Sequence, residues 1–135
     1  MPAEYFKNFN EWNTEKKKLD AFAFKPPLFK EREIWWCSYG VNIGSEVCGK
    51  NKYFRRPILI IKKLSQFSFI GVPMSTKENK GSWYVSVTHS EGIRNTINLA
   101  QIRYIDYKRL DKKIGTIDTA EFVKVKNQLK LILDL

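Results

Sequence analysis

The side chains best suited to chemistry in this sequence stand at the borders of apolar, strand-like runs. Arg56 directly precedes the run at 57–61, and Ser75 and Thr76 follow the run at 67–72. Loops carried by rigid strands are frequent places for functional groups. A planar guanidinium can hold two phosphoryl oxygens, and a hydroxyl can bond a third. Singly, a surface cation and a turn-capping hydroxyl are the commoner roles of such residues, but together with Glu46 they could form a site directed at phosphate.

A long basic segment surrounds these residues. The chain carries 24 Lys and Arg against 14 Asp and Glu, a net charge of +10, and no acidic residue lies between positions 47 and 77. Glu46, just before this segment, could act as a base or orient the arginine. Such a surplus indicates a polyanionic partner, either nucleic acid, an acidic protein or an anionic membrane. The basic residues of the segment are Lys50, Lys52, Arg55, Arg56, Lys62, Lys63 and Lys77.

The residue inventory excludes several kinds of active site. One histidine, His89, and two cysteines, Cys37 and Cys48, rule out paired-histidine catalysis, a four-cysteine zinc module and a disulfide framework. The sequence has no P-loop, dinucleotide fingerprint or serine-hydrolase elbow. We expect His89 to be a hydrogen-bonded turn residue and Cys37 to pack within a strand, whereas Cys48 could be reactive. We therefore expect no metal and no cofactor.

The first thirty residues differ in character from the rest. Apolar residues at helical spacing predict a helix over 5–20, with Asn8 and Glu11 as a capping pair. The prolines at 26–27 then end helical structure. We expect residues 1–30 to form an N-terminal helical extension that packs on the main domain, residues 31–135, or takes part in binding a partner.

From residue 33 onward the pattern is that of short strands followed by one helix. Strands are expected at 34–39, 58–61, 67–72 and 83–88, with shorter ones near 97–99, 102–105 and 113–116, and loops at 40–56 and 73–82. Asp118 with Glu121 forms a capping box before the final helix, and Ile117 with Phe122 a hydrophobic staple. The buried face of that helix is expected to hold Phe122, Val125, Leu129 and Ile132 or Leu133. This order predicts a mainly β, α+β fold, a small, strongly curved sheet or barrel covered by the last helix.

Length and hydropathy are those of one folded domain. The chain has 135 residues, 43% of them hydrophobic, and no apolar run approaches the roughly 20 residues of a membrane span. Its first residues lack the continuous apolar stretch of a secretory signal. We expect a soluble, cytoplasmic protein that does not act at a membrane.

Several motifs in fixed order resemble those of the PemK/MazF toxins. The resemblance covers about residues 32 to 133, and each motif falls on the expected strand end or loop. The motifs are Glu33-Ile34-Trp35-Trp36, Gly44-Ser45-Glu46, Arg56-Pro57-Ile58-Leu59, Val72-Pro73-Met74-Ser75-Thr76 and Gln101-Ile102-Arg103, followed by the capped helix.

This resemblance implies a fold, an activity and partners. It implies a compact SH3-like β-barrel of the PemK/MazF–CcdB type that pairs as a homodimer. The activity implied is that of a ribosome-independent, metal-independent endoribonuclease toxin that cuts single-stranded RNA and is neutralised by an acidic antitoxin protein. Arg56 falls on the family's arginine, Ser75 on its catalytic threonine and Glu46 on the acid of its first loop. Ser75 departs from the pattern, and Thr76 beside it could serve instead.

The residues inserted at 50–55 and the extension 1–30 have no counterpart in compact members. We expect Lys50, Lys52, Arg55 and Lys77 to contact RNA phosphates. Tyr53 and Phe54 are expected either to stack on bases or to tie down the long loop. Two alternatives remain: a non-enzymatic, CcdB-like toxin that contacts a protein, and a basic module that binds nucleic acid without cutting it.

Overall fold

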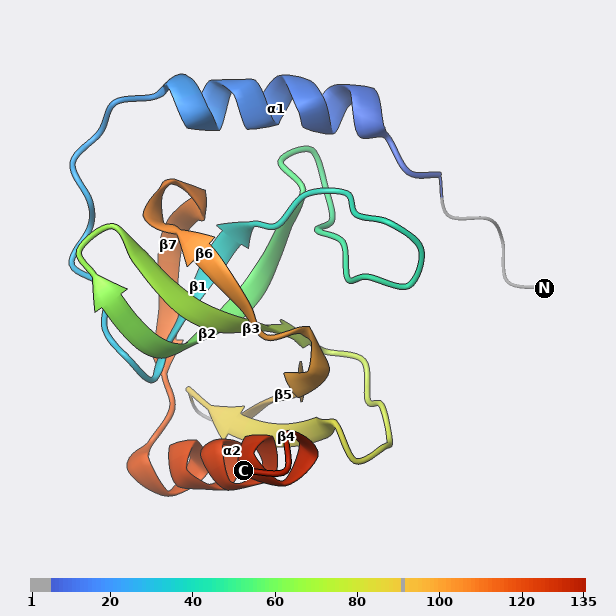
Figure 1. Ribbon diagram of the computed structural model, residues 1–135, viewed down its shortest axis with the longest axis vertical. Helices are drawn as coiled ribbons and strands as arrows, with labels where there is room; N and C mark the ends of the chain where they lie inside the picture. Colours follow the sequence, from blue (N-terminus) through green and yellow to red (C-terminus); the bar gives the residue numbers. More distant parts are fainter. Residues whose placement is uncertain (1–5, 91) are drawn as a thin grey trace.

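The computed structural model describes residues 6–90 and 92–135 (Figure 1). Two α-helices and two short 3₁₀ helices accompany a curved antiparallel sheet. In chain order the elements are α1 (Phe9–Ala21), β1 (Glu33–Ser38), β2 (Arg55–Ser65), β3 (Ser68–Ser75), β4 (Tyr84–His89), β5 (Ile93–Asn98), η1 (Leu99–Gln101), β6 (Arg103–Asp106), η2 (Tyr107–Arg109), β7 (Leu110–Thr116) and α2 (Thr119–Ile132).

The sheet is bent because β3 changes partner along its length. The strand order is β4-β5-β3-β2-β1-β7, and β6 also pairs with β3. Residues 68–71 of β3 pair with β6, whereas Met74 and Ser75 pair with β5. Register shifts in the β1–β7 and β2–β3 ladders bend the sheet further. The mainly β, α+β fold is confirmed, but the described strands show no β4–β7 pairing, so the sheet curls without closing into a barrel.

The C-terminal helix closes one side of the core as expected. The side chain of Asp118 accepts the backbone N–H of Glu121 at 2.8 Å. Buried Ile117 and Phe122 then enter an apolar cluster with Val125 and residues of β1, β2, β3 and β5. Leu129 and Ile132 pack on the same cluster, whereas Leu133 lies exposed, which resolves the two alternatives for the last position.

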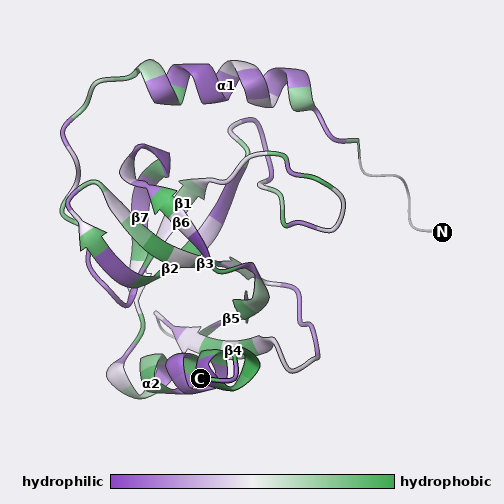
Figure 2. Ribbon diagram, viewed as in Figure 1, coloured by the Kyte–Doolittle hydropathy of each residue, from purple (hydrophilic) through white to green (hydrophobic). Residues whose placement is uncertain are grey.

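The extension packs on the opposite end of the molecule (Figure 1). Helix α1 begins at Phe9, later than expected, because Asn8 caps it by accepting the N–H of Glu11 at 3.0 Å; the expected start at residue 5 lies outside the described residues. Figure 2 shows α1 as mostly hydrophilic, and Trp12 is its buried residue. Beyond the helix, fully buried Phe29 joins a second apolar cluster between the strands.

Several strands are longer than the sequence predicted, and the differences in β2 and β3 affect the site. β2 begins at Arg55, so Pro57 is its third residue, opposite Trp36 of β1. β3 continues to Ser75, so residues 73–75 lie in a strand and not in a loop. The prolines are tolerated because ladders end beside them. Pro57 lies beyond the last β2–β3 pair, and Pro73 lies between the part of β3 that pairs with β6 and the part that pairs with β5. The connection from β1 to β2, called the β1–β2 loop below, therefore spans residues 39–54.

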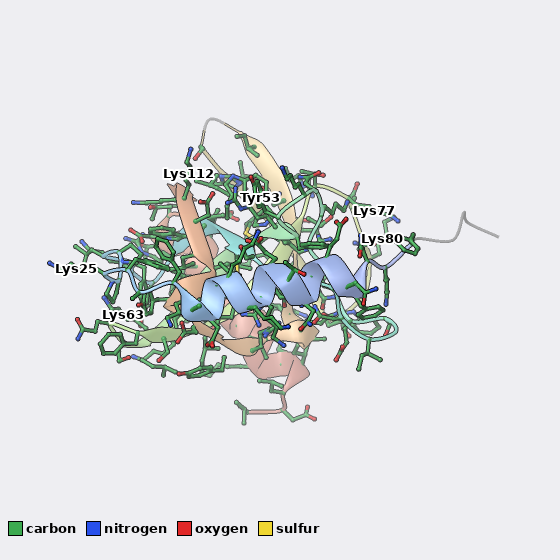
Figure 3. All side chains as sticks on the ribbon, turned by 90° about the horizontal axis from the view of Figure 1, so that it is seen from above. Lys25, Tyr53, Lys63, Lys77, Lys80 and Lys112 are labelled. Atoms are coloured by element: carbon green, nitrogen blue, oxygen red, sulfur yellow. The ribbon has the colours of Figure 1, made fainter. Side chains whose placement is uncertain are left out.

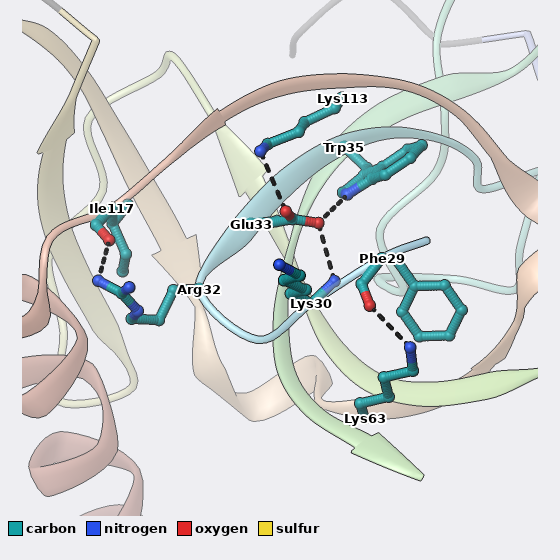
Figure 4. A network of polar contacts seen from close by, with 8 residues as sticks. All are labelled: Phe29, Lys30, Arg32, Glu33, Trp35, Lys63, Lys113 and Ile117. Atoms are coloured by element: carbon teal, nitrogen blue, oxygen red, sulfur yellow. Dashed lines mark hydrogen bonds and ion pairs between the residues drawn. The ribbon is translucent and has the colours of Figure 1, made fainter. Parts of the chain in front are cut away.

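A buried carboxylate fastens the start of β1 (Figure 4). Glu33 forms an ion pair with Lys113 at 3.0 Å and accepts hydrogen bonds from the Trp35 indole at 3.1 Å and the Lys30 backbone at 2.8 Å. Burial alone would raise the pKa of Glu33, but the bonds from Trp35, Lys113 and Lys30 outweigh it and lower the pKa below 4.5. Glu33 thus links the connector, β1 and β7.

We predict that Glu33→Gln lowers the free energy of unfolding by about 1–3 kcal/mol at neutral pH, since hydrogen bonds to a charged group are lost. Because folding lowers the pKa of Glu33, its stabilisation is present above the unfolded pKa and disappears as the pH falls through the folded one. Urea denaturation at neutral pH and at about pH 3 measures this. Glu78→Gln, on an exposed loop residue, is the matched control, and equal effects of the two changes at neutral pH would contradict the prediction.

Candidate functional site

A basic groove of about 430 Å³ lies between the β1–β2 loop, the end of β3 and strands β4 and β5. Lys50, Arg56 and Lys77 line it, and none of its described lining residues is acidic or a histidine. The other lining residues are Ser45, Val47, Pro73, Met74, Ser75, Asn79, Trp83, Tyr84, Thr96, Asn98, Ala100 and Gln101. A concave surface with this charge suits an anionic ligand.

Two backbone carbonyls fix Arg56 in the groove. The residue is half-buried near the start of β2, opposite Cys37 of β1. Its Nε donates to the carbonyl of Cys48 at 2.7 Å, and its Nη1 donates to the carbonyl of Met74 at 3.2 Å. These two bonds orient the planar guanidinium in the groove, and a guanidinium fork of this kind is suited to two phosphoryl oxygens.

Ser75 lies in the same groove, and Thr76 does not. Ser75 is the last residue of β3 and pairs with Thr96 of β5. Its Oγ accepts the backbone N–H of Lys77 at 3.0 Å, which leaves the hydroxyl proton available for donation. Thr76 is exposed and outside the groove lining. The geometry therefore favours Ser75 as the hydroxyl that accompanies Arg56.

Glu46 is not brought to Arg56. Its exposed carboxylate accepts the N–H of Ile43 at 2.8 Å and lines a neighbouring groove with Tyr39, Asn42 and Arg103. Backbone carbonyls fill the orienting role that the sequence suggested for it. The reason is local, because a carboxylate three residues after a turn N–H readily caps that turn.

The expected RNA-contacting residues divide into two groups. Lys50 and Lys77 line the groove, whereas Arg55 points to the other face of β2, as strand alternation requires. Arg55 pairs with Asp111 at 3.0 Å and stacks over the ring of Tyr53 at 4.7 Å. Lys52 also lies over this ring, at 5.8 Å, and Tyr53 is 43% exposed. Tyr53 is labelled in Figure 3, which views the molecule from the side of α1.

Phe54 cannot stack on a base in this structure. It is 7% exposed and meets Trp12 of α1 edge-on, with ring centroids 5.6 Å apart. Its backbone has a φ of 55°, in the left-handed region, at the end of the β1–β2 loop. Of the two roles expected for Phe54, tying down the loop is the one that it fills.

Other groove residues were missed from the sequence. Gln101 accepts the N–H of Val47 at 2.6 Å and donates to the carbonyl of Ser45 at 3.4 Å, so it bridges η1 to the β1–β2 loop. Trp83 lines the groove with a 46% exposed indole. Gln101 lies in one of the motifs that resemble the family, and Trp83 lies just after Gly81 of the preceding loop. Neither sequence feature indicates that the residue lines the groove.

A second basic cluster lies beneath the loop on the side of α1. Arg109 stacks over Trp12 at 5.6 Å and donates to the carbonyl of Ser38 at 3.0 Å. Burial, with the nearby Arg103 charge, lowers the pKa of Arg109. Burial also raises the pKa of the Cys37 thiol to about 12, although both arginines oppose the shift.

Within residues 6–90 and 92–135, no three Cys, His, Asp or Glu side chains gather closely enough to hold a metal ion.

Comparison by sequence decides the family. The profile of the PemK-like, MazF-like toxins of type II toxin–antitoxin systems matches residues 30–133, most of the chain. The chain belongs to this family. The matched range leaves α1 outside it, and no curated protein matches the chain by sequence.

Solved structures of MazF-like proteins share the fold. MazF from Deinococcus radiodurans superposes with a TM-score of 0.66 at 15% identity, covering 81% of this chain and 99% of that one. An endoribonuclease in complex with its cognate antitoxin, from a mycobacterial species, gives 0.60 at 16% identity, covering 80% and 97%. Mycobacterium tuberculosis toxin MazF-mt6 gives 0.59 at 14%, covering 77% and 98%. At these identities the likeness establishes the PemK/MazF-like fold.

Neither helix of the described chain is long and apolar enough to cross a membrane.

The two cysteines of this PemK/MazF-like protein should differ sharply in reactivity. Cys37 is buried with its thiol pKa at about 12, so it stays protonated at about pH 8, whereas Cys48 is only half-buried. We predict that a chromogenic disulfide reagent modifies one thiol per native chain, and both after unfolding. Cys48→Ser should remove the native reaction. Rapid modification of Cys37 in the folded Cys48→Ser protein would contradict this.

Proposed function

We propose that this toxin is an endoribonuclease that cleaves single-stranded RNA without a metal ion, through attack by the 2′-hydroxyl of the RNA. The observation that carries the proposal is the position of Arg56, held by two carbonyls in a groove that also contains Ser75, Lys50 and Lys77. Membership of the toxin family and the similarity to an endoribonuclease support it.

The reaction needs charge stabilisation on phosphorus above all. The 2′-oxygen forms a bond to phosphorus, the bond to the 5′-oxygen breaks, and the products are a 2′,3′-cyclic phosphate and a 5′-hydroxyl. The attacking hydroxyl loses a proton and the departing oxygen gains one. Arg56 would bind two phosphoryl oxygens as their negative charge increases, and donors placed in this way contribute strongly to catalysis.

The remaining groove residues suit a single strand of RNA. Lys50 and Lys77 would hold phosphates on either side of the scissile one. The exposed indole of Trp83 offers a stacking surface for an unpaired base, a role in which sequence analysis had placed Tyr53 or Phe54. Tyr53, with Lys52 and Arg55 around its ring, would take part only if the strand continues beyond the β1–β2 loop.

Two protein partners belong to the proposal. An acidic antitoxin would compete with RNA for the groove, because Lys50, Arg56 and Lys77 attract any polyanion and no described lining residue opposes it. One of the structurally similar proteins was solved with its cognate antitoxin. A homodimer is the proposed assembly, and the cytoplasm the proposed location.

A second function is favoured by one observation. The groove lining, as far as the structure describes it, offers neither a carboxylate nor an imidazole as a base. Such a groove could hold RNA without cutting it. Product analysis separates the two functions, because only the enzyme yields new 5′-hydroxyl ends in the presence of EDTA.

We predict that Arg56→Ala lowers the rate of RNA cleavage about a hundredfold to a thousandfold, since it removes the main donor to the developing phosphoryl charge. Cleavage of a long single-stranded RNA in EDTA, followed under single-turnover conditions, measures this. Arg56→Lys should rescue little, because an ammonium lacks the planar fork. Glu46→Gln is the comparison variant, and we expect it to lower the cleavage rate less than about tenfold. A loss of rate equal to that of Arg56→Ala would indicate that Glu46 acts as the base.

We predict a clear difference between the two adjacent hydroxyls. Ser75→Ala should slow cleavage by about tenfold or more, because a hydrogen bond to the phosphate is lost, whereas Thr76→Ala should leave the rate near wild type. Ser75→Thr should retain most of the activity. The same single-turnover assay compares the three variants, and a Thr76→Ala defect larger than that of Ser75→Ala would assign the role to Thr76 instead.

A further inference from the structure

Helix α1 and the candidate site contact opposite faces of the same loop. Figure 1 shows α1 lying along the β1–β2 loop at the end of the molecule opposite α2. The family match begins only at residue 30. The family match therefore does not account for the contacts between the extension and this loop.

Trp12 is the centre of the contact. It is 6% exposed and forms a small apolar cluster with Val41 and Phe54, at the two ends of the loop. Its indole lies so close to Gly40 that a Cβ there would come within 2.3 Å of it. Gly40 also has a φ of +89°, which disfavours any other residue. The loop is thus shaped to receive this indole.

The base of the loop is closed directly beneath Trp12. The backbone N–H groups of Tyr39 and Gly40 both donate to the carbonyl of Phe54, at 2.8 and 3.1 Å, and Gly49 donates to Gly40 at 2.7 Å. Further along the loop, beside the turn at 43–46, Lys7 Nζ donates to the carbonyls of Asn42 and Gly44, at 3.0 and 2.8 Å. The extension therefore holds the loop at both its base and its tip.

The β1–β2 loop connects the contacts of the extension with the groove. The side chain of Cys48 packs against the Trp12 cluster, while its carbonyl accepts the Nε of Arg56. Ser45, Val47 and Lys50 of the same loop line the groove. A shift of the loop would move the acceptor that orients Arg56, and misplacement by about 1 Å is enough to cost large factors in rate.

We propose that α1 is an intramolecular clamp on the β1–β2 loop and that Trp12 is a positioning residue for Arg56. The cleavage part of this inference rests on the proposed function; the loop-holding part does not. Trp12 lies outside the groove lining, so it acts through the loop and not on the substrate.

The experiment compares the full-length protein with Trp12→Ala, Trp12→Phe and Lys7→Met. Phe22→Ala is the control, because Phe22 is an aromatic residue just past α1 that pairs with Phe24 and is 60% exposed. Amide hydrogen exchange reports the protection of residues 39–54. Single-turnover cleavage at saturating RNA is measured alongside the affinity for a 2′-deoxy oligonucleotide of the cleaved sequence.

We expect Trp12→Ala to speed exchange within 39–54 while the sheet stays protected, and to lower the cleavage rate constant by about tenfold to a hundredfold. The affinity for the deoxy oligonucleotide should change less than the rate, because the lysines remain. Trp12→Phe should restore most of both properties, Lys7→Met should show a smaller loss of the same kind, and Phe22→Ala should match wild type. Lys7→Met also keeps the test open if Trp12→Ala fails to fold.

Unchanged protection of residues 39–54 in Trp12→Ala and Lys7→Met would overturn the clamp, as would a protection loss spread evenly over the chain. Loss of loop protection with wild-type cleavage would overturn the link to Arg56. If the wild-type protein does not cleave RNA, the proposed function fails by itself, and exchange in the loop still decides whether α1 holds it.

Discussion

The guanidinium of Arg56 joins three elements of the chain. β2 supplies its backbone, the β1–β2 loop supplies the carbonyl of Cys48, and the end of β3 supplies the carbonyl of Met74. The two carbonyl dipoles hold the guanidinium charge at a fixed position in the groove. The position of the loop and the end of β3 therefore decide together what this charge can bind.

The bend of the sheet is what brings these parts together. β3 pairs with β6 through residues 68–71 and then with β5 through Met74 and Ser75. Gly71 lies at the switch, where an added Cβ would come within 3.1 Å of the Leu59 carbonyl, so a side chain there would require its neighbours to shift slightly. The two parts of β3 thus face different partners, and Ser75 meets Thr96 at the floor of the groove.

Elements defined by short-range patterns could be predicted from the sequence, and those set by tertiary pairing could not. The caps at Asn8 and Asp118 and the buried face of α2 depend on neighbours within a few residues, and they are present as expected. Strand β3 continues past Pro73 because its last residues pair with β5, and the local sequence pattern does not reveal this pairing. Likewise Arg56 and Ser75 share the groove as expected, whereas Glu46 caps its own turn and Phe54 is covered by a helix distant in sequence.

The long loop and the N-terminal extension are physically complementary. The β1–β2 loop spans residues 39–54, and its conformational freedom must be lost before Arg56 has a fixed acceptor. The loop's own hydrogen bonds close its base, but its apolar residues Val41 and Phe54 need a partner to be buried. Trp12 supplies that partner from a helix whose other residues are largely exposed. In the proposed clamp, the extension therefore anchors the loop from outside the sheet.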